Sequence, residues 1–161
     1  MPPPEFAVGG TLRMFGHNCP VELGVGHPVY EDGVFRVHPV CAREAEFVKF
    51  YRRFAAAYLT AKVRAAALAA GVTVAGVRIG SATGRWGSCS AAGRLNFPWK
   101  LVLCPEELID YVVAHELAHR THMDHSPEFW REVARLCPAW RERRRQLRFE
   151  EQRLRSWAGV R

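Results

Sequence analysis

The HExxH motif at residues 115–119 limits the possible folds and functions of this chain more than any other segment. The motif lies in an apolar stretch that predicts a helix from Pro105 to about His122, since proline followed by acidic residues favours a first helical turn. Four residues along a helix turn by about 400° and rise by about 6 Å, so the two imidazoles of the motif face the same way. Both can then reach one zinc ion at about 2.0–2.1 Å. The motif therefore predicts a metal site built on His115 and His119.

Glu116 follows the first histidine and borders the same helix face. From there its carboxylate is better placed to take a proton from metal-bound water than to bind the metal. Three polar residues on the buried face of an apolar helix would cost stability without such a purpose. We therefore expect a zinc-dependent hydrolase with Glu116 as its general base.

A catalytic zinc needs a third protein ligand and one open coordination position. Two histidines follow the motif, His122 and His125. His125 has the spacing of the third histidine in HExxHxxGxxH enzymes, whereas His122 takes the place of their glycine. His122 would instead lie one turn beyond His119 if the helix continued. The spacing favours His125, and His122 is the alternative.

The remaining patterns predict a mixed α+β fold. An Asp-Gly pair at 32–33 between two apolar runs is typical of a tight hairpin, and an aromatic stripe predicts a long helix that ends at Gly71. The expected elements are short strands within residues 6–38, a helix over 42–70, strands near 72–79, 85–90 and 94–97, and helices over 105–122, 127–136 and from 138 to about 157. We expect one compact domain overall, with a short strand-rich segment at 1–40 and the metal-binding domain over 41–161.

Composition indicates the cellular compartment of the protein and the kinds of partner it can bind. The five cysteines are odd in number and form no CxxC pair, which argues against a disulfide framework or a cysteine zinc knuckle. The N-terminus has no signal-peptide pattern, and no apolar run approaches the ~20 residues that span a bilayer. We therefore expect a cytoplasmic protein without membrane contact. The net charge is +7, and most of the excess lies in the arginine-rich last quarter of the chain.

The motif is one of several short sequence blocks that follow one another in a fixed order along the chain. They are Arg85-Trp86-Gly87-Ser88-Cys89-Ser90, Leu95-Asn96, Pro105, the helix segment from Tyr111 to His119, His125-Ser126 and Phe129-Trp130. Over about residues 78–148 the chain resembles the YgjP-like metallopeptidase family, relatives of the SprT-like zincins. The resemblance implies a minigluzincin or zincin-like core, with a small antiparallel sheet packed on the active-site helix and a helical C-terminus.

The same resemblance implies one zinc ion per chain, with His115, His119 and His125 as ligands and Glu116 as the catalytic residue. It also implies a peptide or unfolded protein as substrate.

A second part of the site is predicted at residues 85–88. In zincins an edge strand beside the cleft pairs with an extended peptide through main-chain hydrogen bonds. We expect Arg85, Trp86, Gly87 and Ser88 to line the cleft, Gly87 allowing close approach and Trp86 forming a wall. The alternative is a packed strand with Trp86 in the core. Candidates for stabilising the oxyanion are Arg85, Arg120 and Tyr111, and the sequence does not choose among them.

Three functions are compatible with these residues. Peptide-bond hydrolysis is favoured by the motif. The family resemblance also suggests nucleotide pyrophosphatase activity with UTP as substrate, and arginine pairs well with phosphate. A DNA-associated protease of the SprT-like kind would use the basic C-terminal helix to bind nucleic acid.

Overall fold

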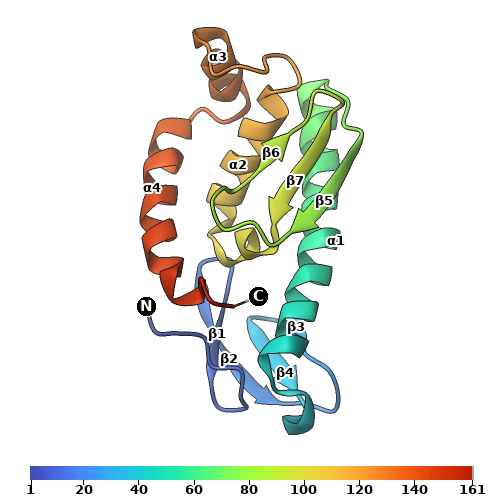
Figure 1. Cartoon of the computed structure of the whole chain (residues 1–161), viewed down its shortest axis with the longest axis vertical. Helices are drawn as coiled ribbons and strands as arrows, with labels where there is room; N and C mark the ends of the chain where they lie inside the picture. The colour runs from blue at the N-terminus through green and yellow to red at the C-terminus, as the bar shows by residue number, and fades with distance from the viewer. Residues whose placement is uncertain (161) are drawn as a thin grey trace.

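The computed structural model describes residues 1–160 and shows two small sheets and four α-helices in that range (Figure 1). The strands are β1 Thr11–Met14, β2 His17–Leu23, β3 Val29–Glu31, β4 Val34–Val37, β5 Gly76–Gly80, β6 Ser88–Cys89 and β7 Arg94–Pro98. The α-helices are α1 Glu44–Ala70, α2 Glu106–Ala118, α3 Pro127–Leu136 and α4 Trp140–Arg153, and short 3-10 helices are η1 Pro39–Cys41, η2 Trp99–Leu103 and η3 Leu154–Trp157. The predicted mixed α+β class is confirmed.

The first sheet has the strand order β1-β2-β4-β3, and the Asp-Gly hairpin predicted at 32–33 joins β3 to β4. The second sheet has the order β5-β7-β6 and lies beside α2 (Figure 1). We expected this sheet to be antiparallel, but it is mixed. After β5 the chain passes through residues 81–87 before it enters β6, so the tight β6–β7 turn brings β7 alongside β5 in the parallel sense.

Helix α1 runs along much of the molecule and contacts both the second sheet and α2 (Figure 1). In the predicted aromatic stripe, Phe47 and Tyr51 are fully buried, and Phe50, Phe54 and Tyr58 are partly buried against the core. Gly71 ends the helix at φ 70°, a left-handed conformation that costs glycine little. Tyr51 stacks on Trp99 with ring centroids 5.2 Å apart and donates a hydrogen bond to the Arg13 carbonyl. The stripe is therefore core, and it ties α1 to both β1 and η2.

Helix α2 ends earlier than its apolar pattern suggested. We expected it to reach about His122, but the last helical residue is Ala118 and His119 is the C-cap. The chain then turns, with the His122 N–H donating to the Ala118 carbonyl at 3.0 Å. The turn changes the chain direction at the end of the motif and leads into α3.

One hydrophobic core draws residues from both sheets and all four α-helices. A buried ion pair crosses this core, with Arg13 on β1 and Glu150 on α4 joined at 2.8 Å. All five cysteines are free thiols. Within residues 1–160, no helix combines the length and the apolar character needed to traverse a bilayer.

Candidate metal centre

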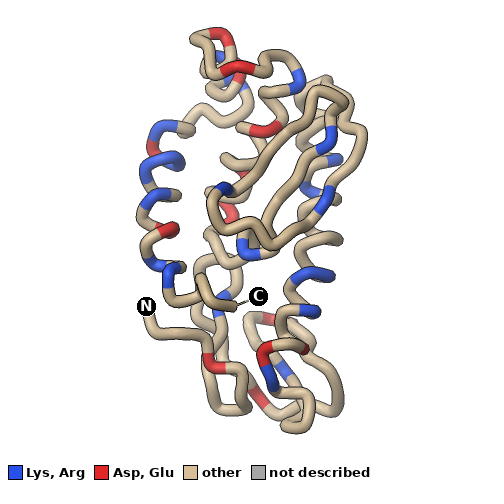
Figure 2. The backbone as a smooth tube through the Cα atoms, viewed as in Figure 1, with Lys and Arg blue, Asp and Glu red and all other residues tan. Residues whose placement is uncertain are grey.

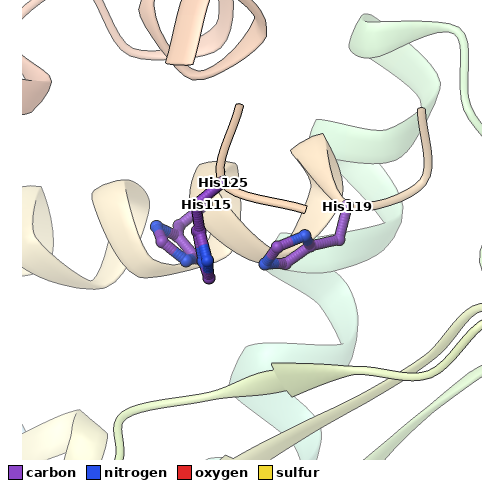
Figure 3. Close-up of side chains that lie close together, drawn as sticks. All are labelled: His115, His119 and His125. Atoms are coloured by element: carbon purple, nitrogen blue, oxygen red, sulfur yellow. The ribbon is translucent and has the colours of Figure 1, made fainter. Parts of the chain in front are cut away.

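Three histidines from two neighbouring segments meet beside the end of α2 (Figure 3). His115 lies on the last turns of α2, His119 caps that helix, and His125 lies in the loop before α3. One ring nitrogen of each lies within 4.8 Å of the others, close enough to converge on a single ion. The structure thus brings together the three residues that the spacing favoured.

The loop between α2 and α3 positions His125 through its own hydrogen bonds. The Ser126 hydroxyl caps α3 by accepting from the Phe129 N–H at 3.3 Å, and the Ser126 N–H donates to Asp124 at 3.3 Å. Proline at the first position of α3 has the φ that a helix start requires. These contacts fix the chain on both sides of His125.

His122 contributes its backbone and not its ring. Its carbonyl lies 3.0 Å from Nδ1 of His119. Since a carbonyl only accepts, this contact places the proton on Nδ1 and leaves Nε2 of His119 with its lone pair free to bind a metal. His122 does not take the positive φ that its alignment with a glycine suggested, because the described non-glycine residues with positive φ are Phe15 and Asp32. The turn forms from ordinary backbone conformations instead.

Aromatic side chains pack around the histidines. The fully buried Phe129 stacks on His119 at 4.5 Å, and Trp130 lies 5.7 Å from the ring of His115. Burial lowers the pKa of His115 to about 4, assisted by the neighbouring charges of His119, His125 and Arg144. Burial likewise lowers the pKa of His119. Both imidazoles are therefore neutral near pH 7, the form that binds metal.

This donor set fits a catalytic zinc ion. Three imidazoles can occupy three of the four positions of a tetrahedral site and leave the fourth for water or substrate. His119 also has the hydrogen bond to a backbone carbonyl that orients many zinc-bound histidines.

Glu116 follows His115 on α2 and is only 5% exposed. Burial raises its pKa to about 7, while the positive charge of Arg85 acts in the opposite direction. Gly87 packs directly against it, since a Cβ atom at position 87 would lie 2.9 Å from Cγ and 3.0 Å from Oε1 of Glu116. Gly87 thus makes room for the carboxylate, a role that the sequence did not predict.

The other residues predicted from 85–88 lie at the start of β6 or immediately before it. Ser88 begins β6, the edge strand of its sheet, and its hydroxyl accepts from Asn96 at 3.2 Å. Trp86 is half-buried and donates from Nε1 to Glu151 at 2.7 Å. Arg85 is exposed. The hydrogen bond of Trp86 therefore holds the loop before β6 against α4.

The three oxyanion candidates differ in their surroundings. Arg120 donates to the carbonyls of Thr73 and Ala91 and packs under Gly93, so its guanidinium is engaged in holding the loops together. Tyr111 is buried, and its ring lies 6.1 Å from that of His115. The charge of Arg85 reaches Glu116. Of the three side chains, Arg120 is the one whose guanidinium is already engaged by backbone carbonyls.

Sequence reasoning missed Arg144. Its guanidinium lies over the ring of Trp130 at 5.0 Å, and Trp130 stacks on Trp140 at 4.6 Å. The charge of Arg144 acts on His115. Arg144 lies four residues after Trp140 and therefore on the same face of α4, the face that contacts α3. No sequence motif connected Arg144 with the metal site.

A mixed α+β fold with an HExxH helix and a third histidine in the following loop is the architecture of a zincin-like metallopeptidase. The model of the YgjP-like metallopeptidase domain family matches residues 2–150, and the chain belongs to this family. The match extends well beyond the blocks between 78 and 148 and includes the N-terminal sheet.

A solved structure supports the fold. The metallopeptidase zymogen abylysin of Pyrococcus abyssi superposes with a TM-score of 0.54 and 25% sequence identity, over 58% of this chain and 95% of that one. A comparison with curated proteins finds no match. Family and fold together identify a metallopeptidase-type hydrolase.

Proposed function

We propose that this protein is a zinc metallopeptidase in which His115, His119 and His125 bind one zinc ion and Glu116 is the general base. The observation that supports this most directly is the convergence of three imidazole nitrogens within 4.8 Å of one another, next to a buried carboxylate. An open fourth position is expected of a catalytic site and not of a structural one.

Zinc in this site would lower the pKa of a water molecule to about 7 and polarise the carbonyl of the substrate. The protein itself contributes the group that transfers the proton. Glu116 accepts the proton of the attacking water and later donates it to the leaving nitrogen. Its buried position and elevated pKa suit both steps, because a group that titrates near pH 7 can exchange protons in either direction.

The edge strand β6 is the proposed binding surface for the substrate backbone. β6 pairs with β7 on one side and contacts α2, which holds the catalytic motif. An extended peptide added to the outer edge would place its main chain beside Glu116, with Arg85, Trp86, Gly87 and Ser88 along its path. The expected substrates are peptides or unfolded proteins.

The decisive test compares zinc-loaded wild-type protein with Glu116→Gln on an unfolded protein and on a panel of nucleoside triphosphates including UTP. We expect the variant to retain zinc, measured by metal content, and to lose about 10²–10⁴-fold in peptide hydrolysis. Hydrolysis of nucleotides alone, dependent on Glu116, would assign the site to phosphoanhydride chemistry. A variant with near-normal peptide hydrolysis would remove Glu116 from the mechanism.

Binding to nucleic acid is a separate prediction, and it is based on the positive charge of the C-terminal helix. Figure 2 shows basic residues along α4, all of them arginine, although Arg145 and Arg153 pair with Glu142 and Glu150 on the same helix. If α4 binds DNA, affinity measured at rising salt should fall steeply, because phosphate contacts release counterions. No binding at low salt would rule the interaction out.

A further inference from the structure

A pocket adjoins Arg85 and Trp86, two of the residues expected along the path of the substrate. It encloses about 300 Å³ between the loop that precedes β6 and the end of α4 with η3. Its walls include Arg85 and Trp86 on one side and Glu151, Leu154 and Arg155 on the other, with Lys100 between them. We call this space the cationic pocket.

Three cations and one carboxylate line the cationic pocket, so its side chains have a net charge of +2, from three positive charges and one negative. Its carboxylate, on Glu151, already accepts a hydrogen bond from Trp86 at 2.7 Å. The half-buried Lys100 donates to the carbonyl of Trp157. Within the described residues, the guanidinium groups of Arg85 and Arg155 have no ion-pair partner within 4.0 Å. Two arginines are thus available to an anionic ligand.

The pocket is within reach of a substrate at the metal centre. Gly87 contacts Glu116, and Arg85 precedes Gly87 by two residues, which is at most about 7 Å of backbone. An extended peptide advances about 3.3 Å per residue. A peptide lying along β6 and residues 85–87 would therefore bring a side chain two or three residues from the cleaved bond to the mouth of the pocket.

One wall of the pocket lies outside the residues that the family model matches. The family model matches residues 2–150, whereas Glu151, Leu154 and Arg155 lie beyond that span.

We propose that the cationic pocket binds the carboxylate of an acidic residue in a peptide substrate, two or three positions from the cleaved bond. The inference rests on the proposed peptidase function and specifies its substrate class. Arginine and carboxylate form charge-assisted hydrogen bonds, often through two parallel contacts, so the pocket selects glutamate or aspartate over their amides. The pocket thereby sets a preference for acidic peptides.

The test measures binding separately from cleavage. Zinc-loaded Glu116→Gln protein is titrated with short peptides blocked at both ends, each containing one Glu at a scanned position, and with matched peptides containing Gln. At one position we expect the Glu peptide to bind about tenfold more tightly, with the difference shrinking as salt is added. Adding Arg155→Gln or Lys100→Met should reduce the ratio to about twofold or less.

Arg145→Gln is the matched control, because Arg145 lies on α4, pairs with Glu142 and does not line the pocket. It should leave the ratio at its parent value. Equal binding of Glu and Gln peptides, or a preference that survives both pocket substitutions, overturns the proposal. So does a nucleoside triphosphate that binds through Arg155 while the peptides show no preference. Because the readout is affinity, failure of wild-type protein to cleave peptides would count against the peptidase function and not against the pocket.

Discussion

At the scale of single residues, the contact between Gly87 and Glu116 is the most sensitive part of the site. A methyl group at position 87 would approach within 2.9 Å of the Glu116 side chain. We expect Gly87→Ala to push the carboxylate away from its position and to lower kcat/KM for peptides about tenfold or more, since small displacements of catalytic groups are costly. Zinc content should be unchanged.

The control for this substitution is Gly80→Ala. A Cβ atom at position 80 would meet no atom within 4 Å, and the backbone there has no positive φ. Its activity should match that of wild type. Equal activity of the two variants would show that Gly87 does not position Glu116.

The group of three histidines was predictable from the sequence because local helix geometry determines most of its arrangement. Helical spacing brings His115 and His119 together, and the ten-residue interval favoured His125. Contacts between distant segments were not predictable, since no local pattern reports them. The packing of Gly87 on Glu116 and the hydrogen bond from Trp86 to Glu151 are both of this kind.

At the scale of elements, the first turn of α1 has a pH-sensitive anchor. Glu46 accepts from Lys49 at 3.0 Å and lies 3.0 Å from His27. The hydrogen bond from Lys49, followed by that with His27, holds the pKa of Glu46 below its usual 4.5. A lowered pKa in the folded state means that the stabilisation is present above pH 4.5 and is lost as the pH falls below it.

We therefore expect Glu46→Gln to destabilise the protein at pH 7 and to have a smaller effect at pH 3, as measured by urea unfolding. Glu22→Gln is the comparison, because Glu22 is exposed and its ion pair with Arg36 spans 3.6 Å, so it should change stability little at either pH. A destabilisation by Glu46→Gln that grows at low pH would contradict the assignment.

Element types were predicted more reliably than their ends and pairing. Gly71 and Ser126-Pro127 marked helix boundaries where the structure has them. The end of α2 was misplaced because residues after Ala118 are compatible with a helix, and the turn depends on contacts with the following loop. Parallel pairing of β5 with β7 depends on the path of residues 81–87, which periodicity does not describe.

At the scale of the whole molecule, the ion pair between Arg13 and Glu150 joins the N-terminal sheet to α4. Both side chains are less than a tenth exposed, and Arg13 also donates to the Leu103 carbonyl at 3.1 Å. Among the described residues, Arg13→Met would leave Arg153, at 3.6 Å, as the remaining ion-pair partner of the buried Glu150 carboxylate. The substitution is expected to cost about 3 kcal/mol in the free energy of unfolding.

The double variant Arg13→Met/Glu150→Leu should recover most of that loss, because apolar residues of similar volume can replace a buried ion pair. Urea unfolding of the single and double variants measures both effects. A double variant less stable than Arg13→Met would show that the pair contributes more than its burial costs.

The same ion pair has a consequence for synthesis. Its two residues are 137 positions apart, and the core that surrounds them also takes in Trp157. Loops of this length close late in folding, and ribosomes extend a chain at about 5–20 residues per second. The last of the three histidines, His125, is therefore synthesised about 1–5 s before Glu150 on α4, which completes the ion pair. A nascent chain would already contain the complete metal motif while its scaffold was still open, so its proteolytic competence would depend on α4 and η3, which are translated after the motif.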